Sequence, residues 1–163
     1  MNNSQFLEPS LPLSLPPMVE VLNELDPIDF LVFSMVSDAW KSLAFFVKMS
    51  VYEVQFSVYR NSLGISIYNK STITRLHIGG SPPWRRRVDK SEGDIDGNKF
   101  SMLRSETVRN ITDIWIQSKT SSSEDLMQMI SQRFIQILRV RTFKYCGIDP
   151  VPEYIAVLNP KIV

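Results

Sequence analysis

The sequence is poor in the residues that form covalent cross-links and metal sites, with one cysteine and one histidine. A disulfide framework needs paired cysteines, and a Cys/His zinc cluster needs several ligands, so both are excluded. We therefore expect no metal and no other cofactor. A single cysteine is typical of proteins of reducing compartments, and we expect the chain in the cytoplasm, the nucleus or both.

The same scarcity argues against catalysis. Cys146 and His77 are the one available thiol and imidazole, but nucleophilic catalysis also needs a third group that orients the base. Glycine-rich phosphate loops and nucleotide-binding motifs are absent as well. We expect structural roles for Cys146 and His77 and no enzymatic activity.

Neither an excess of charge nor a long apolar run is present. The 18 basic and 17 acidic residues give a net charge of +1, so any nucleic-acid contact would have to be local. The apolar runs at residues 30–33 and 43–47 are far too short to span a bilayer. Residues 1–14 are polar and contain prolines, which predicts a poorly ordered lead-in rather than a secretory signal.

Residues 15–49 have the pattern of three short helices. Apolar residues recur at helical spacing in the first segment, and Asp26-Pro27-Ile28-Asp29 is a helix start signal, with Asp26 as N-cap and Pro27 at the first helical position. Ser34 or Ser37 can cap the third helix. That helix has apolar residues on two sides: Val36, Trp40, Leu43 and Val47 on one, Met35, Ala39 and Phe46 on the other.

A unit of this size lies below the size at which domains usually fold alone, so its apolar surface must be covered. The periodicity leaves two alternatives open. The helices pack on the domain that follows, or part of their surface is a face for another protein.

Residues 50–163 predict a second, mixed domain. Period-two alternation at residues 54–58, 65–67 and 73–78 indicates antiparallel strands, and residues 79–99 have the composition of a long loop. Further strands are expected at 111–117 and 140–145, an amphipathic helix capped by residues 121–123 at 124–138, and a short helix at 149–158. The predicted class is α+β, with an N-terminal three-helix module before a small domain of antiparallel strands and a C-terminal amphipathic helix.

The second and third predicted helices also carry a specific motif. The stretch Leu25-Asp26-Pro27-x-Asp29-Phe30-Leu31-x-x-Ser34-x-Val36-Ser37-x-x-Trp40-Lys41-x-Leu43-Ala44 resembles the F-box motif without a gap in the alignment. Upstream, Leu15-Pro16 corresponds to the Leu-Pro pair of the family but lies closer to Asp26 than usual.

The resemblance implies a binding adaptor. F-boxes dock on the Skp subunit of Skp–cullin–F-box ubiquitin ligases, and a second domain holds the protein substrate. Matched by position, the residues expected on the docking face are Leu15, Pro16, Val21, Leu22, Leu25, Pro27, Ile28, Leu31, Val36 and Trp40. The order of elements after the F-box is similar to the nematode-type F-box family with its F-box-associated domain, here in an apparently shortened form.

Two features of the predicted loop have alternative interpretations. Trp84-Arg85-Arg86-Arg87 combines an aromatic with cations, as in local nucleic-acid contacts, but nearby acids favour a solvated loop. This nucleic-acid interface is the alternative function. Residues 92–97 imitate the first half of a calcium-binding loop, but Leu103 stands where the bidentate glutamate belongs, which predicts a turn.

Overall fold

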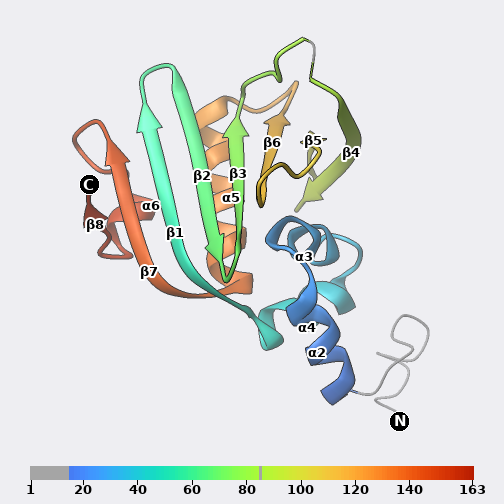
Figure 1. The fold of residues 1–163 in the computed structure, drawn as a ribbon. Helices are drawn as coiled ribbons and strands as arrows, with labels where there is room; N and C mark the ends of the chain where they lie inside the picture. The colour runs from blue at the N-terminus through green and yellow to red at the C-terminus, as the bar shows by residue number, and fades with distance from the viewer. Residues whose placement is uncertain (1–14, 85) are drawn as a thin grey trace.

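The computed structural model describes residues 15–84 and 86–163, so the lead-in predicted for residues 1–14 lies outside it (Figure 1). Three helices come first: α2 (Leu15–Glu24), α3 (Pro27–Phe33) and α4 (Asp38–Val47). The elements that follow are β1 (Met49–Tyr59), β2 (Ser62–Asn69), β3 (Thr72–Ile78), β4 (Val88–Ile95), β5 (Asn98–Ser105), β6 (Ile111–Gln117), α5 (Ser123–Ile137), β7 (Leu138–Gly147), α6 (Glu153–Ala156) and β8 (Lys161–Ile162). The predicted α+β class is confirmed.

The strands form one eight-stranded sheet in the order β4-β5-β6-β3-β2-β1-β7-β8. The pairs β1/β7, β3/β6 and β7/β8 are parallel, and the other pairs are antiparallel. The antiparallel sheet predicted for the strands at residues 54–58, 65–67 and 73–78 is confirmed, whereas the antiparallel strands expected for the domain as a whole do not account for the three parallel pairings. Alternation of side chains marks a strand but not the direction of its neighbour, because both kinds of pairing have the same period of two.

Helix α5 covers one face of this sheet, and no helix of the described chain lies over the opposite face of β1, β2 and β3 (Figure 1). The Ser122 side chain caps α5 by accepting a hydrogen bond from the Asp125 amide at 3.1 Å. Leu126, Ile130 and Phe134 are buried along the helix. The amphipathic helix predicted for this region is confirmed.

The predicted loop at residues 79–99 was wrong in its second half. Residues 88–95 form β4, which pairs with β5 across a turn at Asp96 and Gly97. Both turn residues have positive φ, 53° and 88°, as a tight hairpin turn requires. Strand β4 lies at the edge of the sheet, and only Gly93 and Ile95 are buried in it, so the sequence has no apolar alternation there.

Other predicted elements are present, some of them with different bounds. The strand at residues 111–117 is confirmed as β6, while the strand predicted at 140–145 is longer, as β7. The helix predicted for residues 149–158 is reduced to α6. Ser37 rather than Ser34 caps α4, because the Ser37 side chain accepts the Trp40 amide at 3.2 Å.

A single residue joins the helices to the sheet. Helix α4 ends at Val47, and β1 begins at Met49. Between them Lys48 adopts a positive φ of 54°, and its ammonium group donates to the Gln136 carbonyl of α5 at 2.7 Å. The helices therefore pass into β1, an interior strand of the sheet, without a flexible linker.

Candidate partner-binding site

Helix α3 begins with the acidic pair of the motif. Asp26 accepts a hydrogen bond from the Asp29 amide at 2.9 Å, and Pro27 occupies the first turn, where no backbone donor is needed. Arg104 of β5 bridges both acids, with a contact to Asp26 and with Nη1 at 2.9 Å from Asp29 Oδ1. The start signal predicted from the sequence is thus also an attachment of α3 to the sheet.

This attachment brings one guanidinium group next to two carboxylates. Partial burial, followed by the charge of Asp26, raises the pKa of Asp29 above its ordinary 3.8, although Arg104 opposes the shift. Burial lowers the pKa of Arg104, but the charges of the two aspartates outweigh it and the pKa is raised. A cation is therefore held where two carboxylates would otherwise repel each other.

A second arginine attaches the helices from α5. Arg133 is buried, and its Nη1 donates to the carbonyl and the hydroxyl of Ser34 at 3.3 and 3.2 Å. Its guanidinium lies 5.5 Å from the centre of the Phe45 ring, and its Nε has no hydrogen-bond partner in the described structure. Burial lowers the pKa of Arg133. One arginine with ion pairs, Arg104, and one with hydrogen bonds, Arg133, thus hold the helices against the sheet domain.

Many of the predicted docking residues form the interior of this assembly. Leu22, Ile28 and Leu31 expose 2%, 3% and 0% of their surface, and Pro27 is also buried. These side chains offer almost no surface to a partner in this conformation, because they hold the helices together and against the sheet. Their docking role stays a prediction.

The other predicted docking residues divide into two groups. Val21 and Val36 are exposed by 47% and 63%, whereas Leu25 and Trp40 are half-buried, Trp40 with its ring edge-on to Phe33 at 4.3 Å. The side chains of Leu15 and Pro16 lie outside the described residues, although both residues belong to α2. Surface for a partner is therefore available at Val21, at Val36 and along part of Trp40.

Phe46 is a candidate that the sequence did not reveal. It is 72% exposed, the largest exposed fraction among the apolar residues described in the three helices. Its helical spacing with Met35 and Ala39 placed it in one of two apolar stripes, and the periodicity did not show that Leu43 and Val47 of the other stripe would be buried while Phe46 is exposed. Exposed aromatic side chains on a helix are typical of partner contacts.

A shallow cavity adjoins Val36 and extends the exposed surface toward the sheet. It has a volume of about 500 Å³, and Val32, Met35 and Val36 line one side, while Glu92, Asp94 and Lys99 of the β4–β5 hairpin line the other. The hairpin that the sequence did not predict is thus next to the predicted docking residues.

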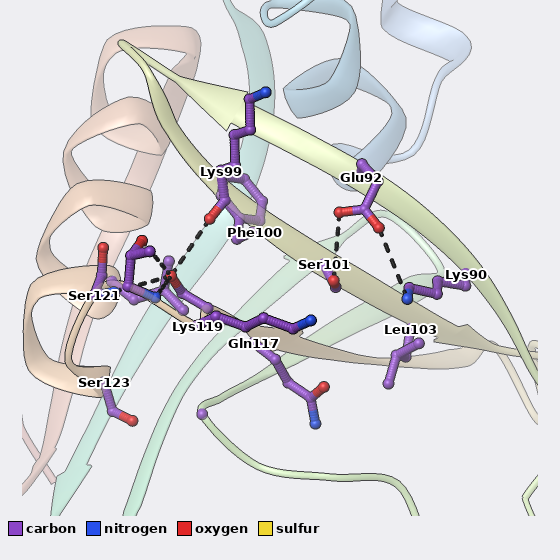
Figure 2. Close-up of a pocket in the computed structure, with 14 residues that line it drawn as sticks. Lys90, Glu92, Lys99, Phe100, Ser101, Leu103, Gln117, Lys119, Ser121 and Ser123 are labelled. Carbon is purple, nitrogen blue, oxygen red and sulfur yellow. Dashed lines mark hydrogen bonds and ion pairs between the residues drawn. The ribbon is translucent and has the colours of Figure 1, made fainter.

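A larger open cavity of about 720 Å³ lies between the β4–β5 hairpin and the start of α5 (Figure 2). Lys90, Lys99 and Lys119 surround it, but Figure 2 shows their ammonium groups pointing in different directions. Lys90 is held 3.8 Å from Glu92, which also accepts a hydrogen bond from Ser101 at 3.4 Å. The ammonium groups of the three lysines are therefore not directed at one point in the cavity.

The basic segment at Trp84 belongs to the connection between β3 and β4. Arg86 turns inward and donates to Asp113 of β6 at 3.2 Å, while Trp84 is 85% exposed and Arg85 lies outside the described residues. Nothing in the described structure supports the nucleic-acid alternative.

Cys146 and His77 are not brought together. The sheet register places β1 and β2 between their strands, with Ser57 and Gly64 in the same row. The Cys146 thiol instead contacts the Tyr59 hydroxyl at 2.5 Å, and His77 lies against Asp113. Within the described residues no group of three or more His, Cys, Asp or Glu could hold a metal ion, and no helix is long and apolar enough to cross a membrane.

Comparison with known proteins identifies the helical region. Residues 11–47 match the family model of the F-box domain, which spans α2, α3 and α4. No curated protein and no solved structure matches the chain. The predicted F-box is thus confirmed, and it supports a role as an adaptor of a Skp–cullin–F-box ubiquitin ligase. The nematode-type family, the F-box-associated domain and the division into domains at residues 14–15 and 49–50 stay predictions.

Proposed function

We propose that this chain is a non-enzymatic substrate adaptor that docks through its F-box on the Skp subunit of a ubiquitin ligase and presents a target protein held by its sheet domain. The match of residues 11–47 to the F-box domain carries the proposal. The sheet domain supports it, because no helix of the described chain lies over one face of β1, β2 and β3, which leaves that face open to a target (Figure 1).

The docking surface that we propose is narrower than the motif. Val36 and Phe46 have the largest exposed fractions among the large apolar side chains described in residues 15–47, followed by Val21, and Trp40 is partly exposed. Burial of such side chains in an interface is worth roughly 1.5–3 kcal/mol each. The buried side chains of Leu22, Ile28 and Leu31 hold the helices in place and so position these exposed residues.

The test is association of the full chain with a purified Skp adaptor, measured by calorimetry. We expect micromolar or tighter binding, and Val36→Asp should weaken it at least tenfold, because a charge would be buried in an apolar interface. Val157→Asp is the matched control: Val157 is 68% exposed, in the segment after α6. Trp40→Ala should also weaken binding, with some loss of stability.

Two results would contradict the proposal. The first is absence of association between the wild-type chain and the adaptor at micromolar concentration. The second is an equal effect of Val36→Asp and Val157→Asp, which would mean that the apolar surface of the helices is not the interface. Thermal melting of each variant separates lost docking from lost folding.

The proposed location follows from the proposed partners. An adaptor acts where its ligase is assembled, so we propose the cytoplasm, the nucleus or both. A fluorescent fusion of the full chain, imaged together with a tagged Skp adaptor, tests this. Accumulation in a secretory compartment would contradict it.

A further inference from the structure

The open face of the sheet carries a polar cluster around one buried carboxylate. The Asp113 side chain is only 6% exposed. Arg75 donates to it twice, from Nε to Oδ1 at 2.9 Å and from Nη2 to Oδ2 at 3.2 Å. His77 lies 2.9 Å from Oδ1, and Arg86 Nη2 donates to Oδ2 at 3.2 Å. Both carboxylate oxygens are thus fully engaged.

This cluster has more donors and more positive charge than Asp113 can satisfy. An arginine has five N–H donors. The contacts of Arg86 run through Nη2 alone, to Asp113 and to Ser105 at 3.4 Å, so its Nε and Nη1 have no acceptor among the described residues. The two arginine side chains are 46% and 36% exposed. Two guanidinium groups facing one carboxylate leave an excess of one positive charge at an accessible position.

The cluster is also rigid. The His77 ring stacks on Trp115 at 5.0 Å, and the Arg86 guanidinium lies 5.7 Å from the centre of the Trp115 ring. Trp115 itself is buried. Because Asp113 and Trp115 hold Arg86 from two sides, its remaining donors are oriented before any ligand binds, which lowers the entropy lost on binding.

Space for a peptide adjoins the cluster. A cavity of about 350 Å³ has His77 and Trp115 of the cluster in its wall, together with Gly80, Arg60 and Glu124, while Arg75 and Arg86 lie outside its lining. On the other side the sheet register places Ser66 beside Arg75 and Gly64 beside His77, so the neighbouring strand carries small side chains there. An extended segment can therefore cross the face next to the arginines.

From this arrangement we infer that Arg75 and Arg86 bind the carboxylate of an acidic side chain in an extended segment of the target protein. The inference rests on the proposed adaptor function, since it assigns the open face to the target. The excess of one positive charge favours a carboxylate over a phosphoryl group, which carries about −1.5 to −2 charges and would lie close to the Asp113 carboxylate.

The test is selection of binding peptides from a random display library on the immobilised full chain. We expect enrichment of sequences with aspartate or glutamate. Binding of a selected peptide should weaken about 10- to 100-fold in Arg86→Ala, which removes charge-assisted hydrogen bonds. Arg87→Ala removes the same charge from the same loop and should have little effect. Asp113 keeps Arg75 and His77 in the Arg86 variant, so its melting temperature should stay near that of the wild type.

Changes in the peptide identify the ligand chemistry. Replacing the acidic residue by its amide should weaken binding at least tenfold. Replacing it by phosphoserine should not strengthen binding; tenfold tighter binding would overturn the assignment to a carboxylate. A library without acidic enrichment, or enrichment that survives Arg86→Ala, would overturn the site itself.

Failure of this inference is distinguishable from failure of the proposed function. Arg86→Ala should bind the Skp adaptor as tightly as the wild type, because Arg86 is on the sheet face and not on α2, α3 or α4. Loss of peptide binding with intact adaptor binding supports the site. Acidic peptide binding by a chain that never binds the adaptor would leave the site standing and remove the ligase role.

Discussion

Asp26 serves both as the cap of α3 and as the partner of Arg104, and two substitutions separate these roles. Asp26→Asn keeps a side-chain oxygen that can accept the Asp29 amide, but it removes the charge opposite Arg104. Asp26→Ala removes both. We expect the alanine variant to lower the free energy of unfolding clearly more than the asparagine variant.

The expected losses in the free energy of unfolding follow from the N-cap and from the solvent exposure of the ion pair. Loss of an N-cap costs typically about 1 kcal/mol. The side chains of Asp26 and Arg104 are 31% and 32% exposed, so solvent screens the pair and its removal costs about 1 kcal/mol rather than the value of a buried pair. The asparagine also relieves the repulsion that helps to raise the pKa of Asp29, which offsets part of the loss. We therefore expect at most about 1 kcal/mol for Asp26→Asn and about 2 kcal/mol for Asp26→Ala.

Urea unfolding followed by circular dichroism measures both values, and thermal melting should show shifts of about 2–4 °C for each kcal/mol at this chain length. Arg104→Met completes the double-mutant cycle. In its background Asp26→Asn should cause no further loss and should stabilise the fold slightly, because Asp26 has lost its cationic partner and its repulsion with Asp29 is no longer offset. Equal losses for the two Asp26 variants, or additive losses with Arg104→Met, would refute this account.

Three further predictions concern stability. Leu31→Ala should lower the free energy of unfolding by about 2–5 kcal/mol, because Leu31 is fully buried, whereas Val36→Ala at an exposed position should stay within about 0.5 kcal/mol in the same urea titration. Gly97→Ala should lower the free energy of unfolding by about 1 kcal/mol. The reason is the φ of 88° at this turn position, since nothing lies within 4 Å of an added methyl group. Gly80 has no positive φ, so the control Gly80→Ala should have the melting temperature of the wild type. The hydrogen bonds and charges of Arg75 and His77 hold the pKa of Asp113 below its ordinary 3.8 despite burial. Its contribution is therefore present above about pH 3.8 and lost as the pH falls through the folded pKa, and Asp113→Asn should flatten the acid limb of a plot of stability against pH.

The elements that the sequence predicted well are those with local signals. Asp26 and Ser122 cap α3 and α5 through residues three positions later, so the determinants of each helix start lie within one turn of chain. The strand at residues 111–117 is apolar through most of its length and bounded by polar residues, and its limits were predicted correctly.

The elements that it missed depend on contacts between distant residues. Strand β4 is stabilised by pairing with β5, and its own side chains carry little apolar signal. The F-box motif identified the helices but not which side faces inward: Leu31 and Val36 belong to one motif, yet one is buried and the other exposed. The Asp113 cluster joins β3, β6 and the loop before β4, and such a meeting follows only from the sheet register.

The junction at Lys48 has a consequence for how a ligase built on this chain would choose its sites. Since no hinge separates α4 from β1, a target on the open face would stand at a fixed distance and angle from the Skp subunit. The reach of the transferred ubiquitin would then depend on where along the sheet the target attaches. In such an assembly the position of the acidic segment in the target's own sequence decides which of its lysines are modified.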